Sequence, residues 1–445
     1  MNIKTQTKNM LRNFDDGLLL RQATINDMEK LAAFNAFIHG YSSLYGNKIA
    51  HWTKELLSGN HPTTKAEDFT LVEDSKTGEI VSSMNLISQT FRYADVEFQG
   101  GRIELVGTHP DYRHRGLVRA QFDVIHQLSE HYGHQIQIIE GIPWFYRQFG
   151  YEPALESGGG RLGYISDLMT QKGNEVGLYH VRNATEKDIL FIDEVYRASS
   201  RRYLVTVQRS RTQWNYEIQG RKPQNLMCRE VCIVESYSGE PVGFFIQPNS
   251  PWGSMLAVIV FEIKAGFNWS DVTATILRYL DKKNQKFTES GQYTCDSIGF
   301  GLGSEHPVYD ILPDQLTQTM PTSTWYIRVS SPLEFLKILI PVFEQRLATS
   351  VLAGYTGELK ISFYRNGMMF SFENGKLREV AEWQPQSVLD GHARFPELTF
   401  FQLLFGYRSI SELKFAHADC TANKTTSILL DVLLPKSASY LWSFV

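Results

Sequence analysis

The sequence has few cysteines, no long apolar run and no strong net charge. Its 445 residues include only four cysteines, at Cys228, Cys232, Cys295 and Cys420. So few cysteines in so long a chain exclude a disulfide framework, and no second pair completes a zinc site with Cys228 and Cys232. We therefore interpret all four as small buried side chains in a reducing compartment.

The absence of a long apolar run excludes a membrane span. The longest apolar stretch, Met255 to Phe261, has only the length of a strand, and residues 1–12 lack the apolar core of a secretory signal. Cytoplasm is therefore the predicted location, without a membrane partner. The formal net charge of −4 argues against a nucleic-acid partner, because such proteins usually carry a basic face.

What the sequence does contain is typical of a soluble globular protein of several domains. Apolar residues make up 42% and charged residues 21% of the chain, and its length indicates two to four domains. Residues 21–28 and 182–189 are similar, each with Ala-Thr followed by an aspartate three positions after the threonine. Both copies predict a strand that ends at a threonine capping a helix. We infer a duplicated unit of about 150 residues.

Two boundaries divide the chain into three regions. A polar run from Gln171 to Gly177 and the segment near Pro321 give predicted regions 1–174, 175–321 and 322–445. In the last region, Trp325 to Val329 predicts a strand, Pro332 to Leu347 a helical segment, and residues 357–372 a hairpin. A short helix at 396–405 and a final strand at 427–434 complete a small α+β domain.

The strongest local signal is a basic turn between a predicted strand and a predicted helix. The strand runs from Ile103 to Gly107, and the helix begins at Leu117. A helix start offers free backbone N–H groups and the positive end of a dipole, which suit a pyrophosphate. Gly116 allows the backbone to approach the phosphates, and the turn carries additional charge at Arg113, Arg115 and Arg119. The alternative is an ordinary exposed turn.

At this turn the sequence resembles the GNAT acetyltransferases. Residues 113–118 fit the pyrophosphate motif Arg-x-x-Gly-x-[Gly/Ala] of that family, except that Val118 replaces the small residue. A predicted strand at 135–140 follows, and Phe145-Tyr146-x-x-Phe149-Gly150-Tyr151 is similar to the family's short helix, which carries a tyrosine near the thiol. The resemblance implies that acetyl-CoA is the co-substrate, without a metal.

The whole layout is similar to the Eis (enhanced intracellular survival) family of GNAT enzymes. That resemblance implies an α+β fold with mixed α/β sheets, in which two tandem GNAT-like domains precede a sterol-carrier-protein-like domain. It also implies a homohexamer. The second copy has no Arg-x-x-Gly turn after its predicted strand at 256–263, so we interpret it as a degenerate GNAT domain that binds no coenzyme.

The resemblance assigns roles to individual residues. It makes Tyr146 the acid and the α-carboxylate of Val445 the base, with Glu104 as a rival base. The tail from Leu441 to Val445 is apolar and is expected to be buried. The predicted cofactor residues are Val106, Gly107, Thr108, Arg113, His114, Arg115, Gly116, Leu117, Val118, Arg119, Gly141 and Ile142.

The acceptor site is predicted from the aromatic residues of the first helical region. The residues that would line it, with Glu104, are Phe34, Phe37, His39, Tyr41, Tyr45 and Trp52. They would suit a bulky amine, although an aromatic core is an equally good interpretation. We expect an N-acetyltransferase that acts on a small polycationic molecule or on a lysine or peptide amine. Transfer would be direct in a ternary complex, because no cysteine lies in this region.

Two alternatives to the acetyltransferase remain at this stage. One is an acyltransferase that uses a longer acyl-CoA, and the other is a non-enzymatic carrier of lipid. The run Gly158-Gly159-Gly160-Arg161-Leu162-Gly163 fits the dinucleotide-binding glycine pattern by letter only. Because no suitable strand precedes this run, we interpret it as a flexible hairpin turn.

Overall fold

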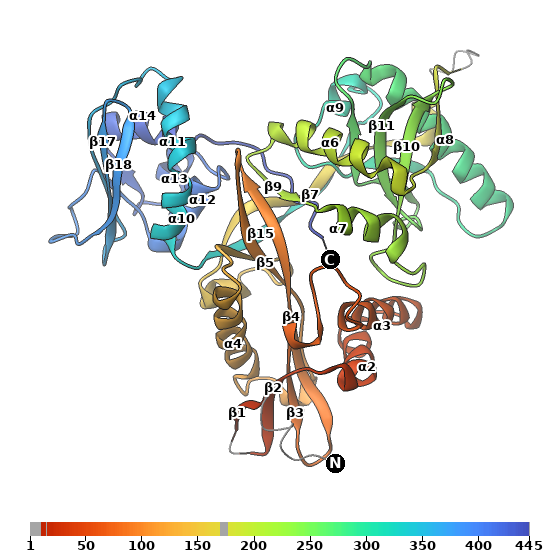
Figure 1. Ribbon diagram of the computed structural model, residues 1–445, viewed down its shortest axis with the longest axis horizontal. Helices are drawn as coiled ribbons and strands as arrows, with labels where there is room; N and C mark the ends of the chain where they lie inside the picture. Colours follow the sequence, from red (N-terminus) through yellow and green to blue (C-terminus); the bar gives the residue numbers. More distant parts are fainter. Residues whose placement is uncertain (1–9, 15, 170–176, 445) are drawn as a thin grey trace.

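The computed structural model describes residues 10–14, 16–169 and 177–444, and confirms a mixed α/β fold. Figure 1 shows the first region as the lower lobe, the second at the upper right and the last at the upper left. A sheet of eleven strands, with order β1-β2-β3-β4-β5-β6-β15-β7-β14-β12 and β9 beside β4, runs through the first two regions. Sheets of four and five strands complete the described molecule.

The first region has α4 on one face of its sheet and α2 and α3 on the other (Figure 1). The predicted strand, turn and helix are present, and the short aromatic helix is a 3₁₀ helix, η4. Its elements are β1 (Met10–Asn13), β2 (Leu18–Gln22), α2 (Met28–His39), α3 (Ser43–Leu57), β3 (Phe69–Asp74), β4 (Glu79–Tyr93), β5 (Val96–Thr108), α4 (Leu117–His131), β6 (Ile136–Ile139), η4 (Phe145–Phe149), β7 (Glu152–Tyr164) and α5 (Ile165–Leu168).

The second region has a similar order of elements, with an additional strand, β9, between its first two helices. The prediction of a single strand at 256–263 is wrong: the strand is interrupted at Ile259, and its two halves, β12 and β13, belong to different sheets. The elements are β8 (Tyr179–Asn183), α6 (Ile189–Ser199), β9 (Val205–Gln208), α7 (Arg211–Asn215), β10 (Arg229–Ser236), β11 (Pro241–Pro248), β12 (Met255–Val258), β13 (Val260–Ile263), α8 (Trp269–Glu289), β14 (Ser297–Phe300), α9 (Val308–Ile311) and β15 (Gln318–Val329).

The duplication is visible in matching polar contacts. In each copy the predicted threonine caps its helix through a reciprocal capping box with an aspartate. An arginine on the preceding strand pairs with that aspartate and with a glutamate of the following hairpin. The pairs are Arg21–Asp27 (2.7 Å) with Arg21–Glu73 (2.6 Å), and Arg182–Asp188 (2.8 Å) with Arg182–Glu235 (2.7 Å).

The two copies exchange their last strands. β7 follows the first copy's η4 but pairs with β14 of the second copy, and β15 follows the second copy but pairs with β6 of the first. The glycine run predicted as a hairpin turn lies inside β7, so that prediction is wrong. A Cβ on Gly160 would lie 2.0 Å from the carbonyl oxygen of Phe300, so glycine is needed where the exchanged strands meet.

The last region has five helices over a five-stranded sheet, within the described residues. The final strand predicted at 427–434 is wrong: residues 424–433 form a helix, capped by Asn423 and buried through Thr426, Leu429, Leu430 and Leu433. The elements are α10 (Pro332–Ile338), α11 (Ile340–Ala348), β16 (Gly357–Ser362), β17 (Gly367–Glu373), β18 (Lys376–Trp383), β19 (Ala393–Arg394), α12 (Phe400–Leu404), α13 (Ile410–Ala416), β20 (Thr421–Ala422) and α14 (Lys424–Leu433).

The predicted domain boundaries stay predictions. The one at 174/175 lies outside the described residues, and the one at 321/322 falls within β15.

Candidate active site

A gap opens where β5 and β6 part. The two strands pair in parallel only from Gly100 to Arg102 of β5. Beyond this point Leu105 has a φ of 52°, and the register with β4 shifts between Ser83 and Asn85. This irregularity is a β-bulge, which bends a strand and redirects its backbone groups. The end of β5 is therefore separated from the loop that follows β6.

The gap leads into a pocket of about 620 Å³ beside the basic turn. Every predicted cofactor residue except Gly141 lines it. Six further residues line the pocket: His39, which the sequence analysis placed in the acceptor site, and Ile38, Tyr112, Phe145, Gln148 and Phe149, which it assigned to no ligand. The turn thus borders a cavity, unlike an ordinary exposed turn.

The turn itself is fixed in an unusual backbone conformation. His114 has a φ of 62° and Gly116 a φ of 72°, and Gly116 is the N-cap of α4. The first helical hydrogen bond runs from Ala120 N to Gly116 O (3.1 Å), so the preceding N–H groups have no acceptor within the helix. These groups point out of the helix start toward the side on which an anion binds.

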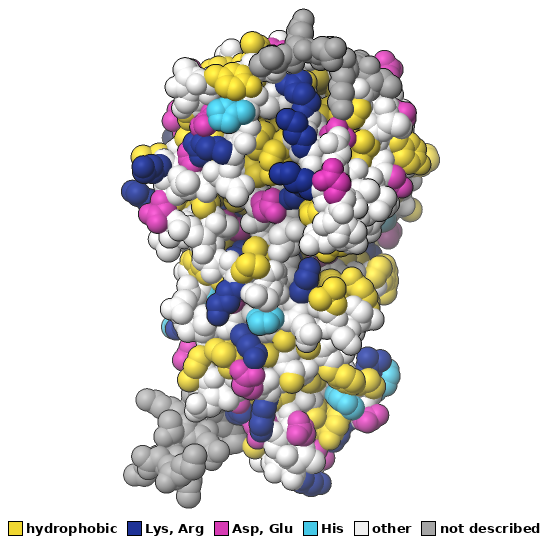
Figure 2. Space-filling model, turned by 90° about the vertical axis from the view of Figure 1, so that its right-hand side faces the viewer, with side chains coloured by type: hydrophobic (Ala, Val, Ile, Leu, Met, Phe, Trp, Pro, Cys, Tyr) yellow, Lys and Arg dark blue, Asp and Glu magenta, His cyan; other side chains and the backbone are white. Residues whose placement is uncertain are grey.

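The three arginines of the turn are exposed, and Arg115 and Arg119 contact neighbouring side chains. Arg115 pairs with Asp16, and its guanidinium lies 5.2 Å from the ring centre of Tyr112. Arg119 donates to Gln148 Oε1 at 2.9 Å and lies over the ring of Phe149 at the pocket wall. Figure 2 shows side chains of both signs mixed over one face of the molecule.

Tyr146 is packed by its ring and placed at the gap by its hydroxyl. The side chain is 3% exposed and contacts the rings of Phe122 and Tyr326. A Cβ on Gly141 would lie 3.3 Å from its hydroxyl, so the hydroxyl lies against the loop after β6, next to the residues that line the pocket. Burial and the nearby charge of Glu104 raise the pKa of Tyr146 to about 12. The phenol is therefore protonated at neutral pH.

Glu104 lies on the other side of the gap. It pairs with Arg102 and sits opposite Asn85 of β4, so the two side chains share a sheet face. Asn85 is fully buried, and neither its amide nitrogen nor its oxygen has a partner among the described residues. Buried polar groups normally have partners, so this pair of atoms marks a place for water or ligand.

His39 adds a further polar atom at the end of α2. Burial lowers its pKa, and its Nε2 is buried without a partner within the described chain. A Cβ on Gly107 would lie 3.4 Å from this nitrogen, which places it at the pocket wall.

The predicted acceptor aromatics occupy different environments. Phe34 and Trp52 are buried in the core between α2, α3 and the sheet, as in the alternative interpretation of these residues. Phe37 is 60% exposed and stacks on His109 with ring centres 5.4 Å apart. The three side chains therefore do not form one aromatic wall.

The C-terminal tail is buried between the first two regions, as expected from its apolar residues. Gln89 of β4 is its anchor: Nε2 donates to Ser443 Oγ (2.8 Å) and to Phe444 O (2.9 Å), while Oε1 accepts from Phe444 N (3.2 Å). Leu441, Trp442 and Phe444 are all buried. The predicted base, Val445, lies outside the described residues.

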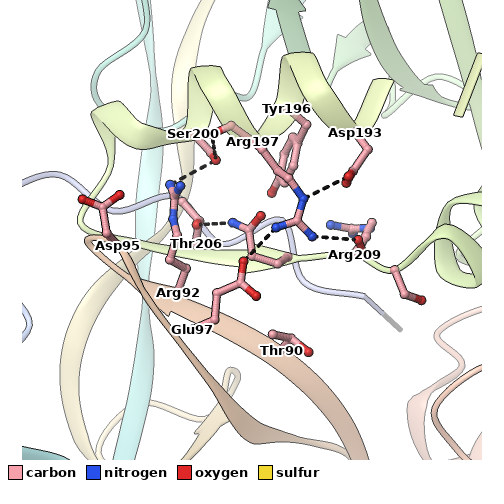
Figure 3. A network of polar contacts seen from close by, with 12 residues as sticks. Thr90, Arg92, Asp95, Glu97, Asp193, Tyr196, Arg197, Ser200, Thr206 and Arg209 are labelled. Carbon is pink, nitrogen blue, oxygen red and sulfur yellow. Dashed lines mark hydrogen bonds and ion pairs between the residues drawn. The ribbon is translucent and has the colours of Figure 1, made fainter. Parts of the chain in front are cut away.

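A polar network holds the second region against the sheet on which the tail lies (Figure 3). Arg197 of α6 donates to Glu97 at the start of β5 (2.7 Å) and to Asp193 (2.9 Å). Arg92 of β4 donates to Ser200 at the end of α6 (3.1 Å). The relative placement of the two copies is therefore set by side chains as well as by the exchanged strands.

The second copy's corresponding gap is filled by the tail. The hydroxyl of Tyr440 donates to the carbonyl oxygen of Ile259, which lies at the break between β12 and β13. It also donates to the carbonyl oxygen of Gly301, just after β14, at 3.0 Å. The same side chain lies against Gly303. This gap therefore has a protein side chain where the first copy has a pocket.

No three or more His, Cys, Asp or Glu side chains in the part of the chain that the structure describes are arranged to hold a metal ion. None of its helices has the length and hydropathy to cross a membrane.

Comparisons with known proteins agree with this geometry. Residues 21–154 match the family model described as an acetyltransferase (GNAT) domain. No curated protein matches the sequence. Among solved structures, a conserved protein from Enterococcus faecalis, described as a probable N-acyltransferase, has 15% identity and a TM-score of 0.68 over 96% of this chain and all of its own.

Two further solved structures share the fold over the same length. A GCN5-related N-acetyltransferase from Anabaena variabilis has 14% identity and a TM-score of 0.68, covering 96% of this chain and 100% of its own. Eis1 from Mycobacterium abscessus has 12% identity and a TM-score of 0.59, covering 96% and 99%. Residues 21–154 are therefore similar to the acetyltransferase (GNAT) domain, and the overall fold of the chain is that of these structures.

Proposed function

We propose that the protein is an acetyl-CoA-dependent N-acetyltransferase with its active site in the first copy. The observation that carries this proposal is the pocket beside Gly116, which joins a helix start, a cationic turn and the end of a bulged strand. In this proposal the N–H groups at Leu117, Val118 and Arg119 bind the pyrophosphate. Arg113 and Arg115 add charge to the same end of the pocket.

The pantetheine would lie in the gap between β5 and the loop after β6. Val106, Gly107, Thr108 and Ile142 line the pocket, and Gly141 precedes Ile142 in the loop after β6; in this proposal their backbone groups would hold the pantetheine. Acetyl-CoA supplies the acetyl thioester. N–H groups fixed by the bulge near Leu105 would stabilise negative charge that develops on the thioester carbonyl.

Proton transfer needs an acid for the sulfur and a base for the amine. Tyr146 is the proposed acid: its raised pKa keeps the proton in place until a thiolate forms. The α-carboxylate of Val445 is the proposed base, supported by the anchoring of Phe444 on Gln89 beside the same sheet. Glu104 remains the rival, because its charge reaches both Tyr146 and His39.

The second copy would serve as a support and would not bind coenzyme. Tyr440 fills its gap, and no arginine-bearing glycine turn follows β13. We also propose, from the resemblance stated above, that the last region is sterol-carrier-protein-like, that the chain is cytoplasmic and that it forms a homohexamer. Analytical ultracentrifugation tests the oligomer directly.

The test of the proposed function is an acetylation assay across amines. The full-length protein is mixed with acetyl-CoA and a panel that includes polyamines, aminoglycosides, amino acids and lysine peptides. The expected result is amine-dependent release of coenzyme A, together with an acetylated amine detected by mass spectrometry. Coenzyme A release with longer acyl-CoA donors alone would favour the long-chain alternative. A lipid that co-purifies with a protein unable to bind coenzyme A would favour the carrier.

A further inference from the structure

Positive charge exceeds negative charge where the tail ends. Arg209, Arg221 and Arg229 of the second copy surround one carboxylate, Glu217. The side chains of Arg209 and Arg221 are 0% and 2% exposed. Arg221 Nε lies 3.2 Å from Glu217 Oε2, and Arg209 Nη2 lies 3.9 Å from Glu217 Oε1.

Arg229 has no ion pair with a carboxylate among the described residues. Its guanidinium donates to the carbonyl oxygens of Leu226 (3.2 Å) and Cys228 (3.1 Å), and its Nη2 lies 3.4 Å from Met227 Sδ. Burial lowers the pKa of Arg229 to about 10, and the neighbouring charge of Arg221 acts in the same direction.

Several guanidinium nitrogens of the cluster are buried without a hydrogen-bond partner in the described chain. They are Nε and Nη1 of Arg209, Nη1 of Arg221 and Nε of Arg229. The other nearby carboxylate, Glu55, is engaged elsewhere, because it accepts from Tyr216, from Asn225 and from the backbone of Lys222. Three buried cations therefore face one carboxylate.

Such an arrangement is costly unless an anion completes it. An uncompensated buried charge destabilises a fold strongly, and arginine does not lose its proton at neutral pH. Unpaired guanidinium N–H groups match the two oxygens of a carboxylate, which arginine binds in bidentate fashion.

The position of the cluster indicates what the anion touches. Arg209 Nη2 donates to the carbonyl of Trp442 (2.9 Å), and its guanidinium lies 3.4 Å from the centre of that indole. The ring of Phe444 lies 5.3 Å from the guanidinium of Arg221. An anion at the cluster would therefore sit at the end of the tail.

We propose that Arg209, Arg221 and Arg229 form a carboxylate-binding site at the end of the tail. The carboxylate has two possible sources: the chain's own α-carboxylate, or the carboxylate of an acceptor that also carries the reacting amine. The first source makes the arginines positioning residues for the tail. The second selects an amino acid or peptide over a polycation. Only the second source rests on the proposed function.

The first experiment needs no substrate. The last residues are replaced by ligation so that Val445 ends in a carboxamide, in the wild-type chain and in the Arg229→Met variant. If the chain's own terminus is bound, the amide lowers the thermal midpoint by about 5 °C or more, and the amide has a much smaller effect in the variant. Arg229→Lys, which keeps the charge, should retain the effect. Arg201→Met, whose side chain is 74% exposed, is the matched control and should leave it unchanged.

The second experiment compares two amines that differ by one carboxylate. Acetylation of phenylalanine and of phenethylamine is measured with the wild type and with Arg229→Met. If the acceptor supplies the carboxylate, kcat/KM favours phenylalanine by about tenfold or more, and the variant loses this preference. A lower thermal midpoint of the amidated chain supports the proposal and identifies the chain's own α-carboxylate as the source. A preference for phenylalanine supports it and identifies the acceptor's carboxylate. If neither is found, the proposal is overturned. The proposed function still stands in that case as long as any amine is acetylated.

Discussion

Replacing Gln89 by leucine should release the tail while leaving the sheet intact. Gln89 is buried on β4, and its side-chain amide contacts Ser443 and both backbone groups of Phe444. Leucine has a similar size and fills the same space. The substitution therefore removes the hydrogen bonds without creating a large cavity.

The magnitude follows from the groups that lose their partners. The N–H and C=O of Phe444 become unsatisfied if the tail stays docked, and the bond to Ser443 is lost as well. At about 1 kcal/mol for each bond, and more for a buried group left unsatisfied, docking of the tail weakens by about 3 kcal/mol. This change raises the population of undocked tail by about 100-fold.

Digestion with carboxypeptidase measures the undocked population, and acetylation of a reactive amine measures its effect on activity. We expect faster release of Val445 and Phe444 from Gln89→Leu, with a loss of activity in the same range. The matched control is Gln99→Leu, an exposed glutamine on the neighbouring strand β5. If the tail of Gln89→Leu is as resistant to digestion as that of the control, this account of its anchoring is refuted.

Three further outcomes are expected. Tyr146→Phe should lower kcat by about 100-fold without weakening acetyl-CoA binding. If calorimetry shows that the affinity for acetyl-CoA falls by the same factor as the kcat from kinetics, the role of Tyr146 as the acid is contradicted. Gly116→Ala and Gly133→Ala should each lower the free energy of unfolding by about 1 kcal/mol, because both glycines have a positive φ and a Cβ at either would contact nothing. The two glycines lie at opposite ends of α4, so only Gly116→Ala should weaken coenzyme A binding. Burial lowers the pKa of His134 to about 4, so between pH 6.5 and pH 4 the unfolded chain binds a proton at this residue and the folded chain does not. The thermal midpoint should therefore decrease as the pH is lowered from 6.5 to 4. The decrease should be less steep in His134→Gln.

Local patterns predicted the first copy well. The capping threonines, the strand before the basic turn and the helix after it all follow from short-range periodicity and capping chemistry, which one segment specifies by itself. The strand exchange could not be predicted, because the pairing of β7 with β14 depends on residues more than 130 positions apart. The run Gly158 to Gly160 was misread for the same reason, since its role is to admit a distant strand.

The candidate site was predicted in part. The turn around Gly116 carries its own signal, and the pocket it borders contains nearly all of the predicted cofactor residues. The final helix is predicted as a strand because Leu429 and Leu430, with the apolar residues around them, fit both the helical and the strand period in so short a run. The capping residue Asn423 is the signal that favours the helix. The cluster of Arg209, Arg221 and Arg229 had no signal at all, because only the fold brings the three side chains together.

The central claim is that the pocket beside Gly116 binds acetyl-CoA and that the corresponding gap of the second copy does not. Isothermal titration of acetyl-CoA into the full-length protein tests it most directly. We expect one molecule to bind per chain, with an affinity that weakens as the salt concentration is raised, because the phosphates contact arginines. Absence of binding, or two equivalent sites per chain, would contradict it.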